Sequence, residues 1–307
     1  MNPSQISSPT NLCAITLVET PADARSARLL LNSLRAFGGT LSHIPAWIFY
    51  QPEPHQPDLT RAFSGLKAVQ LIPLDLDAAA PGSDYPFASK VHACAQAEAL
   101  AGAQLRSLVW FNPQCLILAP PLLIDLSPDF DAALRPVHHK NIGSLAQTPL
   151  DDYWQAVYRS AGLEETPFTV ESFADAQTLR PYFNTHCFAM NPALGLFAAW
   201  REHFQALTCD AAFQSGPCQR PLPRIFLHQA ILSTLVAKSL ARKRIRLLPP
   251  AYSYPLHLHL QVPAGRQPRR LNDLVCPVYE DAFEFPVTLN GLQVDEPLYS
   301  WLAKHSS

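Results

Sequence analysis

The first hundred residues alternate short apolar runs with segments of helical periodicity. Residues 12–18 are almost continuously apolar, which is typical of a strand covered on both faces in a parallel sheet. Apolar residues recur at helical spacing from Ala27 to Phe37, after a Thr-Pro-Ala-Asp segment that suits a helix start and before a Gly-Gly pair. The apolar run at 45–50 predicts a second strand. These segments predict a β-α-β unit with parallel strands, because such crossovers are right-handed.

The same patterns continue through the rest of the chain. Further strands are predicted at 68–74, 107–111, 134–137, 185–190 and 245–248. Further helices are predicted at 86–101, 151–161, 193–207 and 225–240, and the largest irregular loops at 213–223 and 261–270. This order predicts an α/β fold in one composite domain, with a mixed, mainly parallel sheet flanked by helices and a ligand site at the carboxyl ends of the strands.

Composition excludes several classes of protein. Hydrophobic residues make up 48% of the 307 residues and charged residues 16%, which excludes an intrinsically disordered chain. Seven cysteines without a C-x-x-C pair exclude a disulfide scaffold and a zinc ribbon. The apolar run near the N-terminus is too short for a signal or a membrane span, so we expect a cytoplasmic protein. A net charge of −2 gives no general basis for binding nucleic acid.

One stretch of the chain departs from this balance. Residues 211–272 contain no Asp or Glu but ten Lys and Arg residues. Such a stretch is typical either of a basic entrance to a site for an anionic ligand or of a solvated basic face. A third interpretation is that the stretch contacts an anionic membrane surface.

Common catalytic motifs are absent from the sequence. It has no G-x-G-x-x-G, no P-loop, no G-x-S-x-G, no H-E-x-x-H and no EF-hand loop. Readings as a dinucleotide oxidoreductase, a P-loop protein or a serine hydrolase therefore have no sequence support.

The order of several short motifs resembles the nucleotide-diphospho-sugar transferases of the GT-A fold over about residues 12–259. After the first strand and helix, these motifs are Pro86-Phe-Ala-Ser-Lys90, the strand that ends in Asn112-Pro-Gln114, Tyr182-Phe-Asn184-Thr-His186, His228-Gln229 and Leu248-Pro-Pro-Ala-Tyr-Ser-Tyr254. The resemblance implies a Rossmann-like GT-A domain over 1–307, with a nucleotide-binding half (about 12–125), an acceptor-side half (about 126–260) and a C-terminal extension (about 261–307). It also implies transfer of a sugar from a nucleotide-diphosphate sugar donor to a hydroxyl acceptor.

The departures from the family pattern concern the metal. Members carry Asp-x-Asp after the fourth strand to bind Mn or Mg, whereas this chain has Asn112-Pro-Gln114. One explanation is metal-free transfer, with cations of the acid-free stretch neutralising the diphosphate: Arg220, Arg224, Arg266, Arg269 and Arg270. A second explanation places His257 or His259, on one face of an extended strand, beside Asn112 or Gln114 as ligands of Mn or Zn. A third is a catalytically inactive binding or interaction protein.

The candidate site residues follow from strand ends and from the resemblance. For binding the nucleotide sugar they are Glu19, Thr20, Lys90, Asn112, Gln114, Asn184, His186, His228 and Gln229. The alternative role for Thr20 and Gln229 is helix capping. The alternative for Lys90 is that it is an ordinary solvated lysine. For catalysis, His138 is a candidate acid or base, and Glu171 or Asp175 is a candidate carboxylate base for the acceptor hydroxyl of an inverting transferase.

Overall fold

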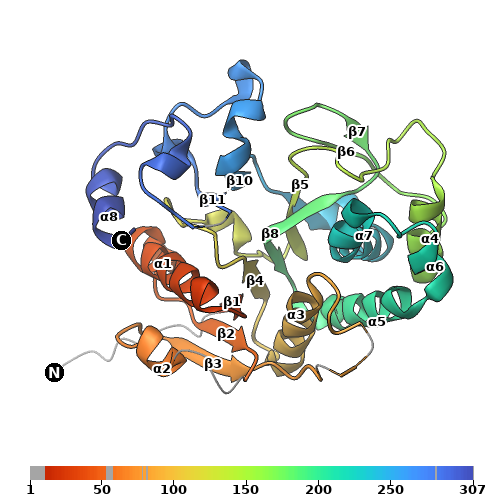
Figure 1. Cartoon of the computed structure of the whole chain (residues 1–307), viewed down its shortest axis with the longest axis horizontal. Coiled ribbons are helices and arrows are strands. Elements are labelled where there is room, and N and C mark those ends of the chain that lie inside the picture. The colour runs from red at the N-terminus through yellow and green to blue at the C-terminus, as the bar shows by residue number, and fades with distance from the viewer. Residues whose placement is uncertain (1–10, 53–57, 78, 81, 281, 307) are drawn as a thin grey trace.

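The computed structural model describes residues 11–52, 58–77, 79–80, 82–280 and 282–306, and a seven-stranded sheet forms its centre (Figure 1). The strand order is β3-β2-β1-β4-β8-β5-β9. The strands are β1 (Leu12–Val18), β2 (Ala46–Tyr50), β3 (Val69–Pro73), β4 (Ser107–Phe111), β5 (Ala132–Pro136), β8 (Phe183–Met190) and β9 (Ile245–Leu247). Strand β8 is antiparallel to β4 and β5, and the other pairs are parallel. The predicted mixed, mainly parallel sheet is confirmed.

Helices cover both faces of this sheet, which explains the continuously apolar first strand. Cys13, Ile15 and Leu17 pack into the cluster that also contains residues of α3, α4, α5 and α7. The alternate residues of β1 pack with α1 and α2 on the opposite face, because successive side chains of a strand point to opposite sides (Figure 1). The helices are α1 (Pro21–Phe37), α2 (Leu59–Ala62), α3 (Ala88–Leu100), α4 (Asp152–Ala161), α5 (Leu196–Cys209), α6 (Ala211–Ser215), α7 (Pro221–Ser239) and α8 (Leu298–His305).

Two predicted helix starts are wrong. Helix α7 begins at Pro221, inside the segment 213–223 that we predicted as a loop and that also overlaps α6. Proline is accepted there because the first-turn N–H groups of a helix have no intrahelical partner. Helix α5 begins at Leu196, after a 3₁₀ turn over Pro192–Leu194 and a left-handed Gly195, and not at residue 193.

The structure also contains elements that the periodicity did not reveal. Strands β10 (Tyr252–Pro255) and β11 (Cys276–Val278) form a separate parallel pair, as β6 (Val170–Glu171) and β7 (Thr178–Leu179) form an antiparallel one. Helix α8 lies beside α1, where the rings of Phe37 and Trp301 are 5.2 Å apart (Figure 1). Within the described ranges, none of the helices has both the length and the apolar character needed to cross a membrane.

The acid-free stretch does not form one basic face. Seven of its ten cations bind elsewhere in the protein: Arg224, Lys238, Arg242, Arg244, Arg246, Arg266 and Arg270. Most of them donate to backbone carbonyl groups, and Arg244 and Arg270 also pair with aspartates. The side chains of Arg220, Lys243 and Arg269 have no hydrogen-bond or ion-pair partner among the described residues. Most cations of the acid-free stretch therefore have partners inside the protein, several of them in distant segments, and three are left without a partner among the described residues.

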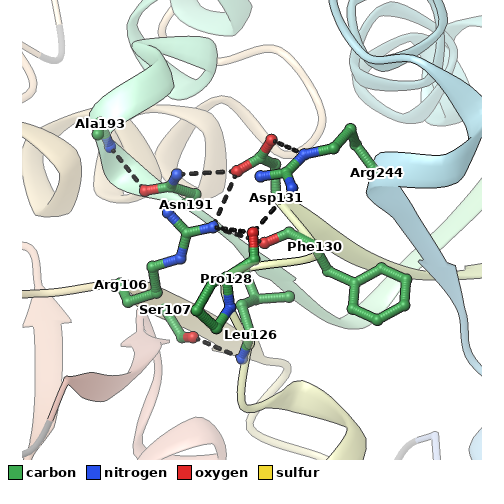
Figure 2. A network of polar contacts seen from close by, with 9 residues as sticks. All are labelled: Arg106, Ser107, Leu126, Pro128, Phe130, Asp131, Asn191, Ala193 and Arg244. Atoms are coloured by element: carbon green, nitrogen blue, oxygen red, sulfur yellow. Dashed lines mark hydrogen bonds and ion pairs between the residues drawn. The ribbon is translucent and has the colours of Figure 1, made fainter.

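Asp131 joins four segments at the amino-terminal edge of β5 (Figure 2). Its carboxylate accepts hydrogen bonds from Arg106 at 3.2 Å, Arg244 at 2.7 Å and the Asn191 side chain at 3.1 Å. The backbone N–H of Asn191 donates to the Asp131 carbonyl group at 2.9 Å. The hydrogen bond from Arg244 lowers the pKa of Asp131. This network fixes the starts of β5 and β9 relative to the end of β8.

We expect Asp131→Ala to lower the free energy of unfolding by about 2 kcal/mol, because it leaves two arginines and an amide without their acceptor. Since the folded-state pKa of Asp131 is lowered, its contribution is present above its unfolded pKa and is lost as the pH falls through the folded value. Urea unfolding at pH 7 and at pH 3 measures both effects. The exposed neighbour Asp129 provides the control variant, Asp129→Ala, which should change stability by less than about 0.5 kcal/mol. Equal stability of the two variants at pH 7 would contradict this role of Asp131.

Candidate functional site

Three adjoining cavities lie along the carboxyl ends of β1 and β4, and Phe87 lines all of them. The central cavity has a volume of about 360 Å³ and is lined by Phe87, Lys90, Asn112, Val137, His138, His139, Asn141, Asn184, Thr185, His186, Ile225, Phe226, His228, Gln229, Pro255, His257, Leu258 and Glu280. The strand-end cavity, of about 300 Å³, is lined by Leu17, Glu19, Asp23, Pro86, Phe87, Lys90, Trp110, Asn112, Pro113 and Gln114. The outer cavity, of about 330 Å³, shares Glu19 and Phe87 with it and reaches Gln51 and Ser89. Together they form a cleft along the edge where parallel α/β sheets bind ligands.

The cleft collects most of the residues predicted from the sequence. The central cavity contains Lys90, Asn112, His138, Asn184, His186, His228, Gln229 and His257, and the strand-end cavity adds Glu19 and Gln114. Three predicted residues do not line any of the three cavities. Thr20 caps α1 by accepting a hydrogen bond from the Asp23 N–H at 3.1 Å. Glu171 is exposed near Arg266, and Asp175 accepts hydrogen bonds from the Lys140 N–H and the Ser172 hydroxyl.

Lys90 places a buried positive charge between the central and strand-end cavities. Only 3% of this residue is exposed, and its Nζ donates to the Thr185 carbonyl group and to Asn112 Oδ1, the latter at 3.4 Å. The Nζ also lies 4.9 Å from the centre of the Trp110 ring. It forms no ion pair with any described residue, and burial lowers the pKa of Lys90 to about 7. A buried cation without a counter-ion is costly for the fold and is suited to an anionic ligand.

The position that carries Asp-x-Asp in the resembling family does not fit a metal ion here. Asn112 Oδ1 already accepts hydrogen bonds from Trp110 Nε1 at 2.8 Å and from the Lys90 ammonium. A divalent cation at this oxygen would face another positive charge, and a neutral amide offers it little compensation. Gln114 donates to Asp23 instead, at 3.2 Å. Among the residues that the structure describes, no three His, Cys, Asp or Glu side chains are grouped to hold a metal.

The predicted pair of histidine ligands is not formed. Residues 256–261 form a 3₁₀ helix and not an extended strand, so His257 and His259 do not share one face. His257 lines the central cavity, whereas His259 is buried and its Nδ1 lies 2.8 Å from the Tyr254 hydroxyl oxygen. Strand β10 ends at Pro255, which is the N-cap of this 3₁₀ helix, so the chain leaves the extended conformation before His257. The geometry therefore gives no support to the histidine-bound metal.

His138 is held as a neutral imidazole by Arg135. Arg135 is 1% exposed, and its guanidinium donates to the Ser253 carbonyl group and, at 3.0 Å, to His138 Nδ1. The proton of His138 is therefore on Nε2, which is buried and has no hydrogen-bond partner among the described residues. Burial and the adjacent Arg135 lower the pKa of His138 to about 2. In this geometry His138 is suited to donate a hydrogen bond through Nε2–H, and not to act as the acid or base that we predicted.

Burial also lowers the pKa of two further histidines of the cavity, His186 and His228. His228 is bracketed by the Thr185 hydroxyl and the Ile225 carbonyl group, each at 3.0 Å, and its ring lies 4.2 Å from that of Phe87. Burial and the charge of Lys90 lower the pKa of His186 to about 3. His228 and its neighbour Gln229 lie beyond the first turn of α7, so the capping role considered for Gln229 is excluded. The cavity thus combines the buried charge of Lys90 with several uncharged polar side chains.

Glu280 is a site residue that the sequence did not reveal. It is the single carboxylate among the described residues that line the central cavity, and its Oε1 lies 3.6 Å from His257 Nε2. Its side chain is about half exposed, so it is accessible to a ligand. Glu280 follows β11 in a segment without periodicity or motif, and no signal in the sequence identifies it. Phe87, at the N-cap of α3 with a φ of +65°, was not singled out either, although it lies within the Pro86–Lys90 motif.

Comparisons with known proteins agree with this architecture. The family model described as the Rhodobacterales glycosyltransferase domain matches residues 15–239. The galactosyltransferase LgtC, solved in complex with donor and acceptor sugar analogs, superposes with a TM-score of 0.54 at 12% identity, covering 96% of this chain and 95% of that chain. An active-site mutant of LgtC gives a TM-score of 0.55 at 13% identity, covering 95% of each chain. No curated protein matches the sequence.

Proposed function

Because the chain belongs to the Rhodobacterales glycosyltransferase domain family and has the GT-A fold, we propose that it transfers a sugar from a nucleotide-diphosphate sugar to an acceptor hydroxyl without a metal ion. The observation that carries this proposal is the buried Lys90 ammonium. The ammonium donates a hydrogen bond to Asn112, at the position where the enzymes of the GT-A family pattern carry a metal-binding carboxylate. Lys90 also lines both the central and the strand-end cavity. The cytoplasmic location expected from the sequence stays a prediction.

The donor is proposed to extend along the three cavities. Its nucleoside occupies the outer and strand-end cavities, where Glu19 and Gln114 offer hydrogen-bonding groups at the end of β1 and after β4. The diphosphate lies at Lys90, close to the first turn of α3, whose free N–H groups favour an anion. An ammonium group and a helix N-terminus supply positive charge in the place of a metal.

The sugar is proposed to occupy the central cavity. The Nε2–H of His138 and the side chains of Asn184 and Gln229 offer hydrogen bonds to its hydroxyl groups. As the bond between the anomeric carbon and the phosphate oxygen breaks, negative charge grows on the departing diphosphate. The Lys90 ammonium is preorganised for that charge by its bond to Asn112 and its contact with the Trp110 ring.

Glu280 is proposed as the base that accepts the proton of the acceptor hydroxyl while its oxygen attacks the anomeric carbon. The support is its place in the central cavity, where His257 orients its carboxylate. The carboxylates predicted from the sequence are less suited to this role. Asp175 already accepts hydrogen bonds from the Lys140 N–H and the Ser172 hydroxyl, and Glu171 does not line the cleft.

Calorimetry with UDP-, GDP-, CMP- and dTDP-sugars tests the proposed function. We expect at least one of them to bind, with a Kd that changes less than about twofold when EDTA is added, because Lys90 and not a metal ion compensates the diphosphate. The same titration in the presence of Mn²⁺ is the matched control.

Each outcome of this titration has a distinct meaning. Absence of binding by all four donors at millimolar concentration would contradict the proposed function. Binding that EDTA abolishes would contradict only the metal-free form of it. Binding without hydrolysis or transfer would favour the alternative, a GT-A binding protein that has lost catalysis.

A further inference from the structure

A fourth cavity adjoins the central one and shares no lining residue with the strand-end cavity. This side groove has a volume of about 540 Å³ and lies between the turn at 140–143, the start of α4 and the segment 217–223 that leads into α7. Asn141 lines both the side groove and the central cavity. Asn141 has a φ of +45°, a left-handed conformation that is uncommon outside glycine and tends to occur at functional sites. The two cavities therefore adjoin each other at Asn141, whose left-handed conformation asparagine adopts more readily than most residues.

Two cations on the side groove are free to bind a ligand. The side chains of Lys140 and Arg220 have no hydrogen-bond or ion-pair partner within the described part of the chain. Arg220 belongs to the acid-free stretch, in which seven of ten cations bind elsewhere in the protein. Of the other three, Arg220 lines the groove, whereas Lys243 and Arg269 line none of the cavities described above. The nearby Asp151 directs one carboxylate oxygen to the Trp154 N–H at the start of α4.

Apart from Asp151 and Asn141, the remaining wall of the side groove is mostly apolar. It contains Ile142, Tyr153 and Leu222, together with three prolines of the 217–223 segment. The Tyr153 hydroxyl donates to the Pro223 carbonyl group at 3.3 Å, and its ring stacks on Phe213. Leu222 is 56% exposed, although it is a large apolar side chain. An apolar wall with cations at its rim suits a ligand that has both an apolar face and a negative charge.

We propose that the side groove binds the part of the acceptor that adjoins the reacting hydroxyl, and that it selects saccharides that carry a carboxylate or a phosphate. The hydroxyl would enter the central cavity past Asn141, toward Glu280. The anionic group would pair with Lys140 and Arg220, while the apolar face of a sugar ring packs on the wall. This inference rests on the proposed function, since it names the acceptor class of the same site.

Binding of three small probes tests the groove: methyl β-glucuronide as the carboxylate, glucose 6-phosphate as the phosphate, and methyl β-glucoside as the matched neutral sugar. Affinities are measured by ligand-observed NMR at low and high salt, on the full chain. We expect at least one anionic probe to bind more tightly than the neutral one, with an affinity that falls as salt is added. Arg220→Gln and Lys140→Gln should each weaken this binding about three- to fivefold, as the loss of one exposed charge contact predicts. Arg269→Gln, on an unpaired arginine that does not line the groove, is the control and should leave binding unchanged.

Equal binding of the anionic and neutral probes, or equal losses in Arg220→Gln and Arg269→Gln, would overturn the inference. A preference for only one anionic probe identifies carboxylate or phosphate as the recognised group. The donor titration with EDTA is independent of these variants. If donors bind while the probes show no charge preference, the inference fails and the proposed function stands, whereas absence of donor binding removes the function itself.

Discussion

Lys90→Met should weaken binding of the nucleotide-sugar donor by roughly 100-fold and leave the free protein at least as stable as the original. A charge-assisted contact to phosphate contributes up to about 3 kcal/mol, and this ammonium is the charge that lies between the two donor cavities. In the free protein the same group is a buried charge without a counter-ion, whose removal relieves a desolvation cost. Calorimetry and thermal unfolding of the same samples measure both effects.

The matched controls for this variant are Lys243→Met and Lys90→Arg. Lys243 is exposed and unpaired, so its replacement should leave donor binding and stability unchanged. Arginine should not restore binding, because a planar guanidinium does not fit the space of an ammonium that contacts Thr185, Asn112 and Trp110. Donor binding by Lys90→Met within threefold of the original would contradict the role of Lys90.

The lowered pKa of Lys90 also predicts a pH dependence. In the free protein the pKa is about 7, so a growing fraction of Lys90 loses its charge as the pH rises from 6 to 9. A bound diphosphate favours the ammonium, and donor affinity should therefore fall over this range, by up to about tenfold per pH unit. Because the unfolded pKa is higher, the unfolded chain binds more protons between about pH 7 and 10, and the contribution of Lys90 to stability rises with pH there. Lys90→Met should remove both dependences.

Glu280→Gln should lower the rate of sugar transfer about 100- to 10,000-fold while changing the donor Kd little. The amide cannot accept the proton of the acceptor hydroxyl, and general-base catalysis contributes that range of rate. Because Glu280 lies in the central cavity and not among the strand-end residues, the contacts proposed for the nucleoside and the diphosphate of the donor should remain intact. Single-turnover transfer with the donor identified by calorimetry separates the two quantities, and Glu280→Asp should retain part of the rate.

Glu171→Gln and Asp175→Asn serve as the controls for Glu280. Both residues were candidates for the base on sequence grounds, and neither lines the cleft. We expect each variant to keep at least about a third of the transfer rate, in line with the small effects of surface substitutions. Retention of anomeric configuration in the product, measured by NMR, would overturn the role of Glu280 as a base, as would a loss of rate confined to Glu171→Gln or Asp175→Asn.

The sequence by itself determined the sheet, most of the helices and much of the cleft. The continuous apolar run of β1, the helical spacing in α1 and the strand ends at Glu19 and Asn112 are local patterns, and parallel strands bring their carboxyl ends to one edge. For that reason Lys90, Asn112, His186 and His228 converge as the motif order predicted. The absence of the family's Asp-x-Asp motif at Asn112 was also visible in the sequence, because a motif depends only on residue identity.

Only the tertiary structure decided which charges face the cleft. Lys90 lies on a helix and its partners Asn112 and Thr185 lie 22 and 95 residues away, so only the fold shows that the ammonium donates hydrogen bonds to both of them. Glu280 enters the central cavity from a segment without periodicity, and the cations of 211–272 spread over separate partners although they are adjacent in sequence. The physical reason is the range of the interactions: periodicity and capping act within a few residues, whereas burial of a charge and the choice of its partner depend on segments that only chain packing brings together.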